Sequence, residues 1–351
     1  LLPSQPRSAP RGDGLLASVS TSSPALITFT SGSTGRPKGI ARSGDFLLLQ
    51  HRLLEDVLRS NADDIDLISL PVFVLSNLAA GAASVIPAGD LRRPARMSGA
   101  RLRRQIAAHG VTRVLAPPAL CAQLADGSHL DVRAVFTGGG PVFPNLWRKL
   151  REAAPKARLC AIYGSTEAEP IAHVDWDEIS PADWQAMATG AGLLAGRPIA
   201  EIALGFDGDE IEVTGPHVNR SYLSSADNAT TKVVRDGLLW HRTGDCGRLD
   251  AHGRLWLLGR KAAARAGAYP FAMETAALSW PGVEAAALLA RQQAGPYLAV
   301  AGRRLDIADL RRRARGLAVA DIVRLPSIPT DMRHNSKVDY IRLQAAIERG
   351  R

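Results

Sequence analysis

The sequence is poor in cysteine, in aromatic residues and in long apolar runs, and each scarcity argues against a class of function. Its three cysteines, Cys121, Cys160 and Cys246, lie far apart and form no CxxC pair, so neither a disulfide framework nor a structural zinc site is expected, and a reducing cytoplasm is the natural compartment. Aromatic residues make up 5% of the chain and do not interleave with basic residues, which argues against nucleic-acid binding. No apolar run reaches the roughly 18 to 20 residues that a membrane helix needs.

The charge balance is basic, with a formal net charge of +9 from 43 basic and 34 acidic residues. Only six of the basic residues are lysines, so arginine supplies most of the excess. The arginine runs lie in stretches with helical spacing, at 92–93, 101–104 and 311–315. This spacing favours solvated helix faces. The alternative is a docking surface for an anionic partner such as an acyl carrier protein.

In the predicted core, residues 25–192, short apolar runs alternate with amphipathic stretches up to about residue 164, a pattern typical of a parallel sheet covered by helices. Buried parallel strands are predicted at 25–29, 65–70, 84–86, 112–115, 133–136 and 158–162. Helices are predicted at 44–59, 98–109, 118–125 and 144–153. We therefore predict an α/β core over these residues.

The flanking segments differ from this core. Residues 1–24 are rich in proline, serine and glycine and predict a loose leader without a signal-peptide core. Residues 193–259 carry short strands between glycine and aspartate turns and predict a small barrel-like β subdomain. Residues 260–351 return to mixed helix and strand and predict a small C-terminal α+β domain.

The strongest local feature is the segment TFTSGSTGRPKG, residues 28–39, which follows an apolar run. The backbone N–H groups and hydroxyls of such a loop can surround phosphate oxygens, and its lysine adds a point charge. The spacing matches neither G-x-x-x-x-G-K-[ST] nor G-x-G-x-x-G. Composition alone would favour a flexible turn.

The string T-S-G-S-T-G-x-P-K-G resembles the phosphate loop of the adenylate-forming superfamily. That superfamily includes acyl- and aryl-CoA ligases, peptide-synthetase adenylation domains and luciferases. Its other motifs follow in order over most of the chain. The resemblance implies that ATP phosphates bind to Thr30, Ser31, Gly32, Ser33, Thr34, Gly35 and Lys38.

A glycine cluster, Gly138, Gly139 and Gly140, ends a predicted strand. It is similar to the family's loop that lies against the adenine ring, where side chains would block a flat base. A plain turn between strand and helix explains the cluster equally well.

A second string, Tyr163-Gly164-Ser165-Thr166-Glu167, also follows a predicted strand and resembles the family's Y-G-x-T-E segment. The resemblance implies that Tyr163 stacks on adenine and that Thr166 contacts the α-phosphate. It also implies that the carboxylate of Glu167 holds Mg²⁺, which prefers hard oxygen ligands.

Three later positions complete the resemblance. Asp245, in a T-G-D string, is implied to accept the ribose hydroxyls, although an ordinary turn would also suit this string. Arg260, in a G-R-K string, is implied to reach the ribose or a phosphate just before the hinge to a mobile C-terminal domain. Lys337, in R-H-N-S-K, is implied to be the catalytic lysine that enters the site from that domain.

The sequence departs from the family before the phosphate loop, where members carry a much longer segment. We expect a fragment, a natural short form, or a chain that a second subunit completes. The predicted fold is thus α/β with an incomplete large adenylate-forming domain. An unpaired sheet edge or an exposed apolar patch should follow, and the acyl pocket would lack part of its wall.

A second departure lies after the hinge, where 261–267 lacks the K-x-x-G pattern of CoA ligases. The strings G-R-K and R-H-N-S-K look most similar to the branch with fatty-acyl-AMP ligases and β-lactone synthetases. We therefore predict an enzyme that converts a carboxylic acid, ATP and Mg²⁺ to an acyl-adenylate and then transfers the acyl group to CoA or a carrier thiol. The alternatives are β-lactone closure and a non-catalytic, nucleotide-binding remnant.

Overall fold

A small two-stranded sheet, the first in the described residues, packs beside the first helix. The structure is a computed structural model, and it describes residues 20–30, 37–127, 129–264, 267–289, 295–330 and 338–349. Strands β1 (Pro24–Thr30) and β2 (Lys38–Ser43) pair antiparallel. Helix α1 (Gly44–Leu58) follows at once, because the Ser43 hydroxyl caps its first turn by accepting a hydrogen bond from the Phe46 amide.

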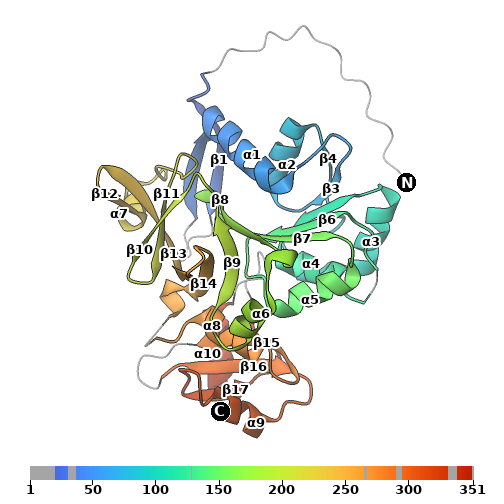
Figure 1. The fold of residues 1–351 in the computed structure, drawn as a ribbon, viewed down its shortest axis with the longest axis vertical. Helices are drawn as coiled ribbons and strands as arrows, with labels where there is room; N and C mark the ends of the chain where they lie inside the picture. The colour runs from blue at the N-terminus through green and yellow to red at the C-terminus, as the bar shows by residue number, and fades with distance from the viewer. Residues whose placement is uncertain are drawn as a thin grey trace.

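Five parallel strands in the order β4-β3-β5-β6-β7 form the centre of the molecule (Figure 1). Alternate residues of β5 face opposite sides. Val114 packs with α3, α4 and α5, whereas Leu115 packs with α1 and α2. The bounds are β3 (Ile65–Ile68), α2 (Pro71–Ala80), β4 (Ala83–Val85), α3 (Gly99–Ala108), β5 (Arg113–Ala116), α4 (Pro118–Leu124), β6 (Ala134–Gly138), α5 (Pro144–Ala153) and β7 (Arg158–Ser165).

The same sheet continues past β7 with antiparallel strands in the order β8-β9-β14-β13-β11-β10, and β12 pairs with β13. One twelve-stranded sheet therefore contains strands from both sides of residue 193, where a domain boundary was predicted. The predicted division into domains stays a prediction. The bounds are β8 (Ala168–Asp175), α6 (Pro181–Ala188), β9 (Leu193–Pro198), β10 (Ala203–Asp207), β11 (Glu210–Thr214), α7 (Ser225–Thr231), β12 (Lys232–Arg235), β13 (Leu238–Leu249) and β14 (Leu255–Arg260), with short turns η1 (Pro94–Arg96) and η2 (Trp176–Glu178).

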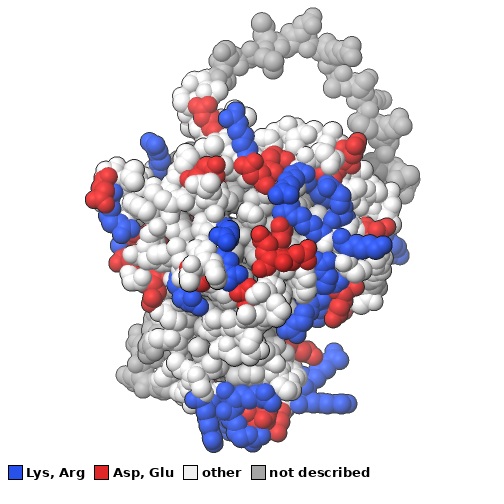
Figure 2. Space-filling view, in the orientation of Figure 1, with Lys and Arg blue, Asp and Glu red and all other residues white. Residues whose placement is uncertain are grey.

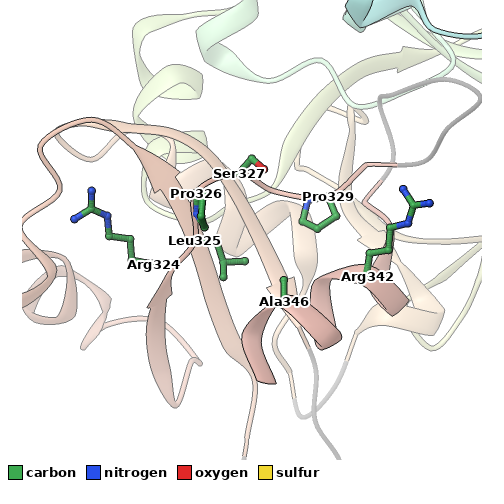
Figure 3. Close-up of a pocket in the computed structure, with 7 residues that line it drawn as sticks. All are labelled: Arg324, Leu325, Pro326, Ser327, Pro329, Arg342 and Ala346. Atoms are coloured by element: carbon green, nitrogen blue, oxygen red, sulfur yellow. The ribbon is translucent and has the colours of Figure 1, made fainter. Parts of the chain in front are cut away.

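A separate three-stranded sheet, ordered β15-β16-β17, forms the C-terminal unit at the lower end of Figure 1. The chain enters it through the single turn η3 (Lys261–Ala263). A hollow lies beside β17 and α10, and the arginines at its two ends, Arg324 and Arg342, point away from each other (Figure 3). The bounds are α8 (Pro270–Ala277), β15 (Val283–Leu289), β16 (Tyr297–Gly302), α9 (Ile307–Ala314), β17 (Asp321–Arg324) and α10 (Tyr340–Arg349).

Basic side chains gather over the C-terminal unit, with acidic side chains among them (Figure 2). In the run 311–315, Arg311 lies 2.8 Å from Asp321, and Arg313 lies 2.6 Å from Asp309. These arginines belong to α9 and pair with acids of their own unit, as expected for a solvated helix face.

The predicted α/β fold class with a small C-terminal α+β unit is confirmed. The prediction of a buried parallel strand at 25–29 is wrong, because β1 pairs antiparallel with β2 and Phe29 is 65% exposed. On α2, close to the edge strand β4, Leu78 is 72% exposed, and the expected apolar patch stays a prediction. None of the helices in the described ranges combines the length and apolar character that crossing a membrane requires.

Candidate functional site

Three predicted site residues from distant parts of the sequence meet at one point. The hydroxyl of Tyr163 on β7 donates a 3.0 Å hydrogen bond to the carboxylate of Asp245 on β13. The other oxygen of that carboxylate lies 3.1 Å from Nε of Arg260, its register partner at the end of β14. Burial, and after it the charge of Asp245, raises the pKa of Tyr163 well above its usual value. The Tyr163 hydroxyl therefore stays protonated and keeps donating to Asp245.

Glu167 occupies the short turn between β7 and β8, directly after Gly164 and Ser165 on β7 and Thr166. Its Oε1 accepts a 2.6 Å hydrogen bond from the hydroxyl of Tyr222. Burial disfavours the charged carboxylate, but the hydrogen bond from Tyr222 and other polar contacts outweigh it and lower the pKa of Glu167. The turn thus presents a charged carboxylate.

Two lysines lie on the ring of Tyr222. Nζ of Lys38 lies 5.3 Å and Nζ of Lys232 lies 5.6 Å from the ring centroid. Burial lowers the pKa of Lys232 to about 8, although the charge of Glu167 opposes this change. Burial and the charge of Lys232 lower the pKa of His241 to about 4, so this imidazole is neutral near pH 7. A cationic pair therefore stands beside the Glu167 carboxylate.

Arg42 on β2 fixes the turn that carries Thr166 and Glu167. The Arg42 side chain is buried, and its Nη2 donates a 2.5 Å hydrogen bond to the backbone carbonyl of Thr166. Its charge also interacts with Glu169 and Glu167. Burial raises the pKa of Glu169 to about 7, and the charge of Arg42 limits this rise. The Arg42 guanidinium therefore links strand β2 to this turn.

The glycine cluster lies next to Tyr163. Gly138 ends β6 and pairs with Ile162, the residue before Tyr163. A Cβ at Gly138 would lie 2.5 Å from the carbonyl oxygen of Ile162, so a side chain there would displace the strand. Gly139 and Gly140 continue the turn, and Gly139 has a positive φ of 75°. Bare backbone therefore borders the aromatic ring.

Six predicted residues, Ser31–Gly35 and Lys337, lie outside the described residues. Thr30 and Lys38, which flank the first group, are register partners, so the two ends of the predicted phosphate loop lie together. Downstream of Lys337, helix α10 begins at Tyr340. The roles of all these residues stay predictions.

The side chains that could act as metal ligands show whether the site suits the predicted Mg²⁺. No group of three or more His, Cys, Asp and Glu side chains that could hold an ion occurs in the part of the chain that the structure describes. Mg²⁺ in nucleotide sites commonly takes one or two carboxylates and fills its other positions with phosphate oxygens and water. The single carboxylate of Glu167 fits a metal that arrives with a nucleotide.

The sequence predictions missed three residues of this site: Tyr222, Lys232 and Arg42. Each comes from a segment without a motif and reaches the site only through strand pairing: Tyr222 bridges to Ile40, and β12, which begins at Lys232, pairs with β13. The one available signal was the scarcity of lysine, because Lys232 is one of only six.

Comparison with known proteins defines the class. Residues 4–219 match the family model described as AMP-binding enzyme. The chain is 32% identical to the olefin beta-lactone synthetase of Stenotrophomonas maltophilia (strain K279a) over 96% of this chain and 69% of that protein. It is 32% identical to the indoleacetate–CoA ligase of Aromatoleum aromaticum over 69% of this chain and 49% of that protein. The chain belongs to the AMP-binding enzyme family, and the resemblance to adenylate-forming enzymes is confirmed.

Solved structures agree on the fold. The structure of IdnL7 superposes with a TM-score of 0.75 at 25% identity, covering 93% of this chain and 68% of that chain. The O-succinylbenzoate coenzyme A synthetase of Bacillus subtilis in complex with ATP and magnesium ion superposes with a TM-score of 0.72 at 23% identity, covering 92% and 70%. None of these relatives supports a second chain that completes the site.

Proposed function

We propose that the chain activates a carboxylic acid, fatty or of related acyl type, as an acyl-adenylate at the expense of ATP. The convergence of Tyr163, Asp245 and Arg260 beside Glu167 is the observation that carries the proposal. The convergence brings an aromatic ring, two carboxylates and a guanidinium together, which supports a site for a nucleotide and its metal. Membership of the AMP-binding enzyme family supports the same activity.

Each group has one task in the proposed mechanism. Tyr163 and the bare backbone at Gly138 hold the adenine, and Asp245 accepts the ribose hydroxyls. Lys38 and Lys232 face the phosphates, together with the residues of the Ser31–Gly35 loop. Mg²⁺ held by Glu167 would offset the phosphate charge when the nucleotide is bound.

The chemical step is a displacement at the α-phosphorus. One oxygen of the substrate carboxylate forms a bond to this phosphorus, and the bond to the bridging oxygen breaks, so that pyrophosphate leaves with the electron pair. The protein contributes positioning and electrostatics. Lys337 would place a positive charge where the negative charge of the attacking and α-phosphate oxygens meets.

The adenylate then needs an acceptor. We propose transfer to a thiol, of CoA or a carrier protein, as in the ligase relatives. The second candidate is lactone closure by a β-hydroxyl of the same acyl chain. The similarity to the olefin beta-lactone synthetase favours it, because that match extends over 96% of this chain.

The three cysteines are free and buried, which supports the proposed cytoplasmic location.

The test is acid-dependent exchange between pyrophosphate and ATP, followed by product analysis. Purified protein is incubated with ATP, Mg²⁺ and a panel of fatty and hydroxy acids, with CoA, with a carrier protein or with neither. We expect exchange with at least one acid and its loss, by about 10²-fold, in Glu167→Gln. Glu152→Gln, on the exposed face of α5, is the control and should exchange normally. Binding of Mg-ATP without exchange for any acid would instead identify a nucleotide-binding remnant.

A further inference from the structure

The segment 90–110 carries six arginines and a single acidic residue, Asp90. It comprises the turn η1 and helix α3, which lies on the flank of the molecule, apart from the C-terminal unit (Figure 1). One arginine, Arg92, forms a 3.1 Å ion pair with Asp90. Four others are exposed and form no ion pair within the described ranges: Arg93, Arg96, Arg101 and Arg104.

The arginines of α9 differ from this group, because acids of their own unit offset them. Arg312 and Arg313 lie 3.0 and 2.6 Å from the carboxylate of Asp309. On α3, Arg101 and Arg104 are three positions apart and are therefore neighbours on the helix, where like charges repel each other. The charge on α3 is thus unfavourable in the free chain, and an anionic partner would stabilise it.

Aliphatic side chains accompany these arginines. Leu91, directly before the first of them, is 39% exposed, and Ile86 is 50% exposed. The segment that carries Ile86 is held against α3, because the Gln105 side chain donates a 2.8 Å hydrogen bond to the Ile86 carbonyl oxygen. Gln105 follows Arg104 and lies about one helical turn after Arg101. The surface therefore combines exposed aliphatic groups with exposed guanidinium groups.

This surface reaches the edge of the sheet at which the nucleotide site lies. Strands β4 and β5 both run parallel to β3, so the segment 86–96 leaves the carboxyl end of β4 and α3 returns toward the start of β5. Gly138 and Tyr163 lie at the carboxyl ends of β6 and β7 in the same parallel array. The start of α3 and the candidate site therefore share one edge of the sheet.

The composition of the surface selects among anionic partners. Nucleic acid fits poorly, because the segment 90–110 contains no Phe, Tyr or Trp on which a base could stack. An acidic protein would match the charge. An anionic bilayer matches the charge and also accepts aliphatic side chains below its headgroups. All six cations are arginine, whose guanidinium binds phosphate oxygens in pairs. A lipid surface therefore matches both kinds of side chain.

We propose that residues 86–104, the α3 surface, dock the protein reversibly on an anionic lipid bilayer. Clusters of about four to eight basic residues bind such membranes, and neighbouring aliphatic side chains add to the affinity. Docking would turn the edge of the sheet that carries the nucleotide site toward the membrane, where amphiphilic acids gather. The inference goes beyond the proposed acid activation and does not depend on it.

Vesicle sedimentation of the full chain tests the proposal. The probes are vesicles of phosphatidylcholine alone and of phosphatidylcholine with about 30% phosphatidylglycerol. At about 0.1 M salt we expect the partition coefficient for the anionic vesicles to exceed that for the neutral ones by about 100-fold or more. At about 0.5 M salt most of this excess should disappear, because salt screens the attraction. The absence of any excess at low salt would overturn the proposal.

Variants then assign the binding to the α3 surface. Each basic residue near an anionic membrane strengthens binding by about fivefold, so Arg101→Gln combined with Arg104→Gln should weaken it by about 25-fold. The matched control, Arg312→Gln combined with Arg313→Gln, removes the same charge from α9 and should bind like the unaltered chain. If the first variant does not fold, as judged by its thermal melting, Arg93→Gln combined with Arg96→Gln replaces it with the same expectation.

Leu91→Ser tests the aliphatic contribution without a change of charge. Because only part of this side chain is exposed, we expect binding to the anionic vesicles to weaken by about threefold or more, with the same dependence on salt. An unchanged affinity would contradict the proposed contact of aliphatic side chains with the bilayer.

Two further results would reject the α3 surface as a lipid-docking site. Equal losses in the α3 and α9 variants would attribute binding to overall charge. Calorimetric binding of a purified holo acyl carrier protein, lost in the α3 variant while the unaltered chain ignores vesicles, would assign the surface to an acidic protein instead. Acid activation is measured by pyrophosphate exchange without vesicles, so the failure of either proposal leaves the other intact.

Discussion

Tyr163 and Asp245 are 82 positions apart in the chain, and a 3.0 Å hydrogen bond joins the tyrosine hydroxyl to the aspartate carboxylate. Arg260 holds the other carboxylate oxygen. Asp245 is thereby fixed from two sides before any nucleotide arrives. In the proposed role of Asp245, a fixed acceptor would bind ribose hydroxyls with little loss of side-chain entropy, which is the general advantage of a preorganised site.

Asp245→Asn tests this arrangement. An amide cannot accept two ribose hydroxyls as well as a carboxylate does, and the change also leaves Arg260 without its counter-charge. Because charge-assisted hydrogen bonds contribute roughly 1.5–3 kcal/mol each, we expect the Kd for Mg-ATP to rise by about tenfold or more. Isothermal titration calorimetry measures it. The exposed control Asp126→Asn should bind normally. A change below about twofold in Asp245→Asn would remove this residue from the nucleotide site.

The predicted catalytic lysine requires a different comparison, between binding and turnover. A cation that acts on charge developing at the α-phosphate affects the transition state more than bound ATP. Lys337→Ala should therefore lower exchange by about 10²- to 10³-fold. Its Kd for Mg-ATP should stay close to that of the unaltered chain. Lys156→Ala, an exposed lysine, serves as the control. Near-normal exchange in Lys337→Ala would exclude Lys337 from the mechanism.

The central parallel sheet and several loops at its strand ends could be predicted because each is a contiguous signal. Residues 133–136 and 158–162 are apolar runs, and both are strands of the parallel sheet. The carboxyl ends of these strands carry Gly138 and Tyr163, and the parallel pairing of β6 and β7 brings these two residues together. The order of the strands in the sequence and their parallel direction are therefore enough to predict that Gly138 and Tyr163 lie together in one half of the site.

The other half depends on pairings that no local pattern reveals. The run 25–29 looks like a core strand, yet it pairs antiparallel with β2, and that pairing places Arg42 under Thr166. Tyr222 reaches Glu167 from a loop before α7 and has no motif of its own. Glu169 follows a recognised string by two residues, but only the fold turns it into the wall of a cavity.

The buried lysine beside Tyr222 predicts a pH dependence of nucleotide binding. Burial lowers the pKa of Lys232 to about 8, so this side chain loses its charge in the free protein as the pH rises through 8. Binding of ATP phosphates favours the charged form. Affinity for Mg-ATP should therefore be constant near pH 7 and weaken above pH 8, by up to about tenfold for each pH unit.

Calorimetric titrations between pH 6.5 and 9.5 measure this decrease in affinity for Mg-ATP. Lys232→Met should abolish the pH dependence and should also lower the affinity itself. Lys149→Met, at an exposed lysine on α5, should retain the pH dependence.

The effect of Lys232 on the free energy of unfolding has the opposite dependence on pH. Between the folded pKa and the higher unfolded one, the unfolded chain holds a proton that the folded chain has released, so this residue makes unfolding less favourable as the pH rises. An affinity that stays flat above pH 8 would rule out a contact of Lys232 with phosphate.

A buried ion cluster at the other end of the central strands predicts a purely structural effect. Arg113 on β5 is 0% exposed, and its Nε donates a 2.7 Å hydrogen bond to Asp66 on β3. Its Nη1 lies 3.1 Å from Asp64, which is also buried. The guanidinium therefore lies between two carboxylates that have little access to water. Loss of its charge would leave Asp66 without a cationic partner, whereas Asp64 would keep its ion pair with Arg133.

Arg113→Met retains much of the side-chain volume but removes the charge. We expect the free energy of unfolding to fall by roughly 3–5 kcal/mol, the usual cost of breaking a buried pair on one side. Urea denaturation followed by circular dichroism measures the change. Arg92→Met, which removes a well-exposed arginine from its pair with Asp90, should leave the midpoint unchanged. Equal midpoints for the two variants would show that water or a rearranged neighbour compensates the carboxylates, and that the cluster does not hold β3 against β5.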